Sequence, residues 1–145
     1  MTRLVIDASV ALSWIFEDES NVNSEAILRS LEVSTVVVPS HWNLEVVNAL
    51  LSAERKGRIT SADATKGLSL LDCLPISVDN RTAEISSSQT LALARAHRLT
   101  IYDAAYLELC LREGIGLATF DRDLISACKS MGVALVLSNA PEKEL

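Results

Sequence analysis

The feature that most constrains the fold is an apolar run near the start of the chain, which ends abruptly in a carboxylate. Leu4, Val5 and Ile6 form this run within the predicted strand at residues 3–6, and Asp7 follows it directly. A short apolar run rich in β-branched residues predicts a strand buried on both faces, as in the parallel sheets of α/β proteins. Ligands bind outside the carboxyl ends of such strands, so Asp7 stands where chemistry is expected.

Strand and helix signals alternate along the rest of the chain. This alternation is typical of a parallel sheet with helices on both faces, and glycine and proline residues fall between the elements. We therefore expect an α/β fold with a central parallel sheet of about five strands. The expected strands are residues 3–6, 35–38, 76–78, 117–119 and 133–137.

Helical patterns fill the segments between these strands. Thr60 with Asp63, and Thr100 with Asp103, have the spacing of a capping residue and its acidic partner at the start of a helix. The expected helices are residues 9–16, 24–31, 41–55, 60–73, 81–97, 100–113 and 122–131.

Length and composition favour one soluble domain. The chain has 145 residues, of which 49% are hydrophobic and 22% charged. We expect residues 1–138 to form the domain and residues 139–145 to be a polar C-terminal tail. No apolar run approaches the roughly 20 residues that span a bilayer, and we expect no signal peptide before the first strand. We therefore expect a cytoplasmic protein without membrane contact.

The cysteines and the net charge narrow the possible functions. Cys73, Cys110 and Cys128 show neither metal-binding nor disulfide spacing and lie in apolar helical contexts, so we expect them to be core residues. The net charge of -6 argues against a generally basic nucleic-acid binder. It does not exclude nucleic acid, because catalytic carboxylates add negative charge that a bound divalent cation offsets.

Three aspartates stand at equivalent places along the predicted sheet. Asp7 follows the first strand, Asp121 follows the fourth, and Asp103 lies at the start of the helix opened by Thr100. Each can be a helix-capping residue, since negative charge at a helix N-terminus is favourable by about 0.3–1 kcal/mol. Capping alone does not require the acids to converge. Crowded carboxylates repel one another unless a cation is present, and ligands that are all oxygen select Mg²⁺ or Mn²⁺.

Glu45 is a fourth candidate, on the helix expected over residues 41–55. In helical projection, Glu45, Asn48 and Ser52 form a narrow polar stripe beside the apolar face of Trp42. This stripe suits a cleft, and the alternative is a solvated face with a few exposed leucines. Exposed apolar patches mark interfaces, and we expect two of them. They are formed by residues 14–16 and by Leu44, Val47 and Leu51.

Four segments resemble the motifs of PIN-domain ribonucleases, and more closely those of the VapC-type toxins of bacterial and archaeal toxin–antitoxin pairs. The resemblance covers nearly the whole chain. It implies a three-layer α/β/α sandwich, PIN-like, and an endoribonuclease that depends on Mg²⁺ or Mn²⁺ and acts as the toxin of such a pair. The segments are DASVA at 7–11, PSHWNLEVVNAL at 39–50, TIYDAAYL at 100–107 and LATFDRDL at 117–124.

The resemblance also implies the site residues and the partners. The implied partners are an RNA substrate, a second copy of the chain in a homodimer, and a cognate antitoxin whose tail inserts toward the acidic site. The family's acidic positions, catalytic and metal-binding, match Asp7, Glu45, Asp103 and Asp121. Its supporting polar positions match Ser9, Asn48 and Thr119, with Asp123 as an extra acid nearby.

Other functional classes fit the sequence less well or make no different prediction from it. A phosphate-accepting receiver module would place a second acid beside Asp7 and a lysine after the fifth strand, and the sequence has neither. A nucleophilic triad is not indicated, because neither His41 nor His97 stands with a serine or cysteine in a recognisable motif. A catalytically silent PIN-like scaffold stays open, since only an activity assay distinguishes it. The basic cluster at residues 55–58 suits either phosphate contact or a solvated loop.

Overall fold

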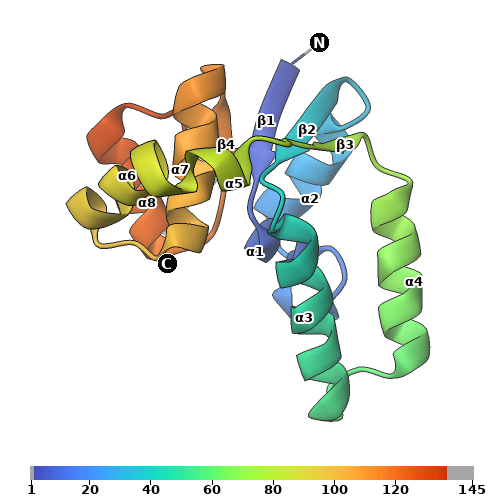
Figure 1. Cartoon of the computed structure of the whole chain (residues 1–145). Helices are drawn as coiled ribbons and strands as arrows, with labels where there is room; N and C mark the ends of the chain where they lie inside the picture. Colours follow the sequence, from blue (N-terminus) through green and yellow to red (C-terminus); the bar gives the residue numbers. More distant parts are fainter. Residues whose placement is uncertain (1, 137–145) are drawn as a thin grey trace.

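Four parallel strands form the central sheet of the computed structural model, which describes residues 2–136 of the chain (Figure 1). The tail expected at residues 139–145 lies outside the described residues. The order across the sheet is β3-β2-β1-β4. The strands are β1 (Thr2–Ile6), β2 (Ser34–Val38), β3 (Ile76–Val78) and β4 (Gly116–Ala118).

The strand order reverses at β1. This strand pairs with β2 on one side, where Leu4 lies opposite Val36, and with β4 on the other, where Val5 lies opposite Leu117. The chain first moves outward from β1 through β2 to β3, and then returns across the sheet to β4. The carboxyl ends of β1 and β4 therefore flank the switch point at which open α/β sheets bind ligands.

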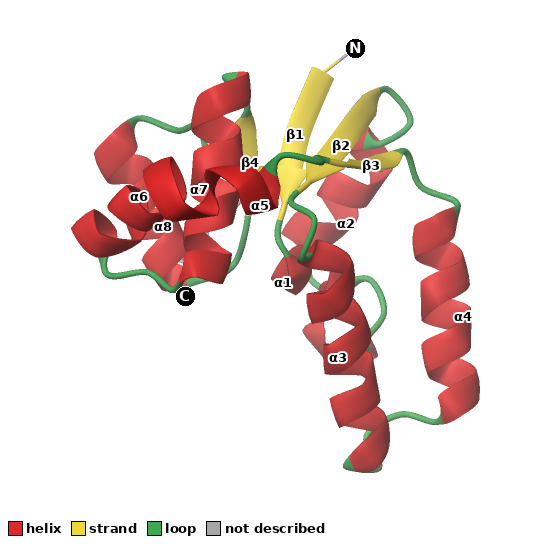
Figure 2. Cartoon of the chain, in the orientation of Figure 1, coloured by secondary structure: helices red, strands yellow, loops and turns green. Residues whose placement is uncertain are grey.

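Helices cover both sides of the sheet, as expected for the three-layer α/β/α sandwich, which is confirmed (Figure 2). Helices α5 to α8 gather on one side, α1 and α2 lie on the other, and α3 and α4 run as a pair beyond the carboxyl ends of the strands. The helices are α1 (Ala8–Ser13), α2 (Val22–Ser30), α3 (Trp42–Arg55), α4 (Ser61–Asp72), α5 (Thr82–Ile85), α6 (Leu91–His97), α7 (Ile101–Glu113) and α8 (Arg122–Met131).

Burial on both faces explains why the strands read as continuous apolar runs. Val5 and Ile6 of β1 are fully buried, and α7 packs against both β1 and β4. Each such aliphatic side chain stabilises the fold by about 1.5–3 kcal/mol relative to its exposed state. Strand β1, which directly precedes Asp7, is thus packed on both faces, and this packing fixes the position of Asp7.

The expected fifth strand is reduced to one bridge within the described residues. Leu135 forms an isolated parallel bridge with Leu117, and the Val136 N–H donates to the Leu117 carbonyl at 2.9 Å. Gly116 permits this close approach, because a Cβ there would lie 3.0 Å from the carbonyl oxygen of Ala134. Leu137, the last residue of the expected strand, lies outside the described residues.

Helix α1 is shorter than expected, since it ends at Ser13 rather than Phe16. The Trp14 indole N–H donates to the Ser24 carbonyl at 2.7 Å, and Phe16 turns into the core, so the chain leaves the helix. A short 3-10 helix, η1 (Glu17–Glu19), follows. The expectation of an exposed apolar patch at residues 14–16 is therefore wrong: Phe16 is buried and the two residues before it are half-buried.

A π-helical turn, η2 (Ser86–Thr90), interrupts the helix expected over residues 81–97. The Ser86 and Ser88 hydroxyls donate to main-chain carbonyls three residues earlier, at 2.7 and 3.1 Å. Such local bonds compete with the regular helical ladder. The segment therefore forms α5 and α6 with the π turn between them.

The cysteines divide into two groups. Cys110 and Cys128 are buried, as expected, but Cys73 is exposed, which corrects the prediction for that residue. Cys73 is the capping residue at the end of α4, two positions beyond Leu71, which is buried. Within residues 2–136, no helix combines the length and apolar character that a membrane crossing requires.

Candidate active site

Asp7 occupies the switch point of the sheet. It directly follows β1, its backbone N–H donates to the Ala118 carbonyl of β4 at 3.2 Å, and its side chain is buried. The same carboxylate caps α1 by accepting from the Val10 N–H at 3.3 Å. The expectation that Asp7 caps this helix is therefore confirmed. Because one carboxylate can do more than cap, this contact does not argue against a second role.

Two hydroxyl groups hold the Asp7 carboxylate. Ser9 Oγ donates to Asp7 Oδ1 at 2.6 Å, and the Thr119 hydroxyl donates to Oδ2. Ser9 Oγ also accepts from the Phe120 N–H at 3.2 Å, so it ties the start of α1 to the segment after β4. Burial, with a smaller contribution from Asp121, raises the pKa of Asp7 to about 6.

Asp121 lies on the other side of the switch point and caps α8. Its Oδ2 accepts from the Leu124 N–H at 3.0 Å, and its own N–H donates to Thr119 Oγ1 at 3.0 Å. The two capping aspartates, Asp7 and Asp121, are thus joined through the single hydroxyl group of Thr119. The segment after β1 and the segment after β4 are neighbours because these two strands pair, although they are far apart in the chain.

Asp103 lies in the first turn of α7, and its carboxylate does not cap the helix. Thr100 Oγ1 accepts from the Asp103 N–H at 3.1 Å. Among the described residues, the Asp103 carboxylate accepts no hydrogen bond in return, unlike Asp63, whose carboxylate accepts from the Thr60 N–H at 3.1 Å. The expected capping pair at Thr100 is therefore only half formed.

The pKa of Asp103 is raised to about 6, first by burial and then by surrounding carboxylates. Those carboxylates belong to Asp121, Glu45, Asp7 and Asp123. The acids named by the sequence are therefore neighbours in space, although they come from four separate segments of the chain.

Glu45 faces α7 from the first turn of α3. The Tyr106 hydroxyl donates to Glu45 Oε1, and His41 Nε2 lies 3.7 Å from the same oxygen. The His41 ring packs edge-on against Tyr106, with centroids 5.2 Å apart. Burial lowers the pKa of His41, and burial together with the Glu45 contact raises the pKa of Tyr106.

Sequence reasoning missed the roles of Tyr106 and His41. Both lie inside the quoted motifs, but neither carries a pattern that points to Glu45. The spacing of three between Asp103 and Tyr106 was the available signal, since residues three apart share a helix face.

The remaining predicted residues lie at the edge of this group. Asn48 is exposed, one turn beyond Glu45 on α3, and Asp123 is exposed in the first turn of α8. Among residues 2–136, no three His, Cys, Asp or Glu side chains lie close enough to hold one ion as they stand. The acids are therefore neighbours rather than a closed ligand shell.

The donor set nevertheless suits a hard divalent cation. All the acids offer carboxylate oxygens, which Mg²⁺ and Mn²⁺ prefer. Within the described part of the chain, no lysine or arginine forms an ion pair with any of them, although Arg112 pairs with both Asp79 and Glu108 elsewhere. A group of mutually repelling acids without a lysine or arginine partner is the arrangement that a bound cation would relieve.

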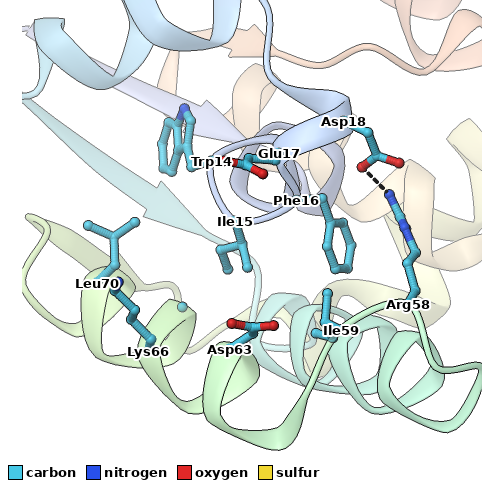
Figure 3. A pocket seen from close by; sticks show the side chains of 11 residues that line it. Trp14, Ile15, Phe16, Glu17, Asp18, Arg58, Ile59, Asp63, Lys66 and Leu70 are labelled. Carbon is cyan, nitrogen blue, oxygen red and sulfur yellow. Dashed lines mark hydrogen bonds and ion pairs between the residues drawn. The ribbon is translucent and has the colours of Figure 1, made fainter.

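A separate pocket of about 640 Å³ lies away from these acids, between α4 and the segment that follows α1 (Figure 3). Phe16 and Ile59 line its apolar part, and Arg58 reaches Asp18 at its rim at 2.7 Å. None of the four predicted acids lines it. Concavity alone therefore does not identify the candidate active site, which is identified by its chemistry.

Comparison with known proteins decides the family. The sequence model of the PIN domain family matches residues 4–130. The chain belongs to the PIN-domain family. This PIN domain is 32% identical over 124 residues to a protein named Ribonuclease VapC3 from Pyrobaculum aerophilum, covering 84% of this chain and 92% of that protein. It is 28% identical over 128 residues to Ribonuclease VapC3 from Mycobacterium tuberculosis, covering 88% and 89%.

Solved structures agree with the PIN fold. The crystal structure of PAE2754 from Pyrobaculum aerophilum superposes with a TM-score of 0.63 at 22% identity, covering 93% of this chain and 90% of that one. VapC20 from Mycobacterium tuberculosis, described as a Sarcin-Ricin loop cleaving toxin, gives 0.63 at 16% identity, covering 95% and 99%. At these identities the likeness shows the fold alone. The resemblance to VapC-type members is confirmed by the sequence relatives.

Proposed function

We propose that this chain is the toxin of a toxin–antitoxin pair, an endoribonuclease that hydrolyses RNA phosphodiester bonds with a carboxylate-held Mg²⁺ or Mn²⁺. The observation that carries the proposal is the gathering of Asp7, Glu45, Asp103 and Asp121 around the switch point, where no lysine or arginine of the described residues pairs with them and only the His41 ring lies near Glu45. The names of the VapC3 relatives support the reaction class.

The four acids would hold the ion. When bound, the ion supplies a water of lowered pKa and stabilises the charge that develops on the scissile phosphate. The hydroxyl groups of Ser9 and Thr119 fix the rotamer of Asp7, and Tyr106 orients Glu45. Such supporting contacts decide how precisely ligand oxygens are placed.

Charge makes cation binding a condition for substrate binding. An acidic pocket without a cation repels RNA phosphates, and the chain as a whole carries a net charge of -6. A cognate antitoxin, a homodimeric assembly and a cytoplasmic location complete the proposal. The antitoxin and the homodimer rest on the family and on the exposed apolar strip of Leu44, Val47 and Leu51 on α3. The cytoplasmic location rests on the family.

The experiment is incubation of the purified chain with total cellular RNA in Mg²⁺ and in EDTA, with Asp7→Asn purified in parallel. We expect cleavage only by the parent and only in Mg²⁺. Equal cleavage by Asp7→Asn in Mg²⁺ would contradict the assignment of Asp7 as a catalytic residue, and equal cleavage by the parent in EDTA would contradict the metal mechanism. No cleavage under any condition would favour the catalytically silent scaffold.

A further inference from the structure

We propose that Tyr102 is a stacking platform that holds one nucleobase of the RNA beside the scissile phosphate. The inference rests on the proposed nuclease function and adds a residue that positions the substrate. It starts from the exposure of this ring, its place beside the acids, and the neighbours that fix it.

Tyr102 is the exposed aromatic residue of the chain. The sequence contains two tryptophans, two tyrosines and two phenylalanines, all within the described residues. Tyr102 is 61% exposed. A single exposed apolar side chain is ordinary by itself, but an exposed aromatic ring offers a flat face on which another ring can stack. The other five are buried or half-buried: Trp14, Phe16, Trp42, Tyr106 and Phe120.

The position of Tyr102 ties it to the acids. It directly precedes Asp103 in the first turn of α7, and its ring centroid lies 5.6 Å from that of His41. His41 Nε2 in turn lies 3.7 Å from Glu45 Oε1. The Tyr102 ring is therefore separated from Glu45 by the single side chain of His41, and its residue adjoins Asp103 in the chain.

Its neighbours hold the ring in place. The His41 ring packs between Tyr102 and Tyr106, with ring centroids 5.6 and 5.2 Å away. Tyr106 is buried and bound to Glu45. A surface that is already ordered loses little conformational entropy when a ligand binds, so the ring is preorganised for a planar partner.

The charge of the site favours this kind of contact. A bound cation offsets the acids only locally, and the chain as a whole carries a net charge of -6, which opposes binding of the RNA backbone. A contact that does not depend on phosphate charge would therefore add affinity beside the scissile phosphate. Stacking on an aromatic ring is such a contact, because every nucleobase presents a π-face whatever its sequence.

The test compares steady-state cleavage of a short RNA by the parent, Tyr102→Ala, Tyr102→Phe and Leu111→Ala, all in Mg²⁺. Leu111 is an exposed apolar residue at the far end of the same helix and serves as the matched control. We expect the alanine variant at position 102 to raise KM by roughly five- to 150-fold, the range measured for removing one stacked base. The phenylalanine variant keeps the ring and should match the parent, as should Leu111→Ala.

A second arm uses RNAs with one abasic site at successive positions around the cut. For the parent, one abasic position should raise KM about as much as Tyr102→Ala does. For Tyr102→Ala, the same RNA should bring no further loss, because the ring and the base contribute through one contact. Melting temperatures and light scattering of all variants show whether folding or assembly has changed.

Several results would overturn the inference. An unchanged KM in Tyr102→Ala, or an equal loss in Tyr102→Phe, rules out stacking by this ring. A Tyr102→Ala variant that changes only the oligomeric mass assigns the ring to a protein interface instead. Absence of cleavage by the parent itself would overturn the proposed function and this inference together, whereas normal cleavage by Tyr102→Ala would overturn this inference alone.

Discussion

The hydroxyl group of Thr119 donates a hydrogen bond to the Asp7 carboxylate, although the two residues lie 112 positions apart in the chain. The same oxygen accepts the N–H of Asp121 at 3.0 Å. One fully buried side chain therefore connects the carboxyl end of β1 with the start of α8. The candidate active site is assembled only when β1 and β4 are paired.

Thr119→Val should weaken both stability and activity. Valine keeps the shape but leaves the Asp121 N–H without its acceptor, which we expect to lower the free energy of unfolding by about 1–3 kcal/mol. Looser placement of Asp7 should lower RNA cleavage by roughly 10- to 100-fold. Urea unfolding and cleavage rates measure the two effects. Thr35→Val on β2 is the matched control, and an equal effect there would contradict a specific role for Thr119.

Metal-free stability should depend on pH through Asp7 and Asp103, whose pKa values are each raised to about 6. An unfolded aspartate titrates near pH 4, so between pH 4 and 6 the folded state binds more protons. Stability from these groups therefore rises as the pH falls from 6 to 4. In EDTA, Asp7→Asn should be at least as stable as the parent at pH 7.5. Its advantage should shrink by pH 4.5, and an advantage that grows toward low pH would contradict the assigned shift.

The part of the fold that sequence predicted best depends on local patterns. The apolar run before Asp7, the capping pair of Thr60 and Asp63, and the helix end at Gly114 all act over a few residues. Patterns of this kind reflect burial and main-chain hydrogen bonding, which the neighbouring residues largely decide. The sequence also predicted that the acids converge at one edge of the sheet, because parallel strands place their carboxyl ends there and a reversal of strand order makes two of those ends neighbours.

The features that the sequence did not predict depend mainly on contacts between distant segments. The bond from Tyr106 to Glu45 joins residues 61 positions apart, and nothing in either helix alone indicates it. Likewise the bond from Trp14 to Ser24 ends α1 early, although the sequence through Phe16 favours a helix. The π turn at residues 86–90 arises from serine hydroxyls that compete with the main chain.

Arg112→Met should destabilise the fold without a specific effect on the site. Arg112 binds both oxygens of Asp79 at 2.9 Å and also pairs with Glu108, whose side chain is only 7% exposed. Removing the guanidinium leaves a buried carboxylate unpaired, which we expect to lower the free energy of unfolding by about 3–5 kcal/mol.

Adding Glu108→Gln to Arg112→Met should restore part of that loss, because the unpaired charge is removed. Arg81→Met is the control: its pair with Glu84 is exposed on both sides, so its removal should change stability by at most about 1 kcal/mol. Equal losses in the two arginine variants would contradict the importance of burial. Urea unfolding at constant pH provides the comparison.

The chain should form a dimer through the apolar strip on α3. Leu44 is 75% exposed there, and Val47 and Leu51 continue the strip along the helix. Leu44→Asp should shift the molar mass in light scattering toward the monomer. Val22→Asp, at a residue 78% exposed on α2, is the matched control and should leave the mass unchanged. A monomeric parent at high concentration would refute the dimer.

The central claim is that the aspartates bind a cation as well as cap helices. Asparagine caps a helix about as well as aspartate, so Asp→Asn variants separate the two roles. Asp103→Asn is the most informative of these variants, because the Asp103 carboxylate accepts no hydrogen bond from residues 2–136. Asp7→Asn, Asp121→Asn and Glu45→Gln should follow it. Asp63→Asn, in the Thr60 cap and away from the site, is the control.

The decisive measurement is the RNA cleavage rate of Asp103→Asn in Mg²⁺, with melting curves recorded in Mg²⁺ and in EDTA. We predict that the variant loses most of its activity and that its melting temperature in EDTA is no lower than the parent's, because one of several repelling charges is gone. The rise in melting temperature that Mg²⁺ gives the parent should shrink in the variant. Full activity in Asp103→Asn, with an unchanged response to Mg²⁺, would contradict the account.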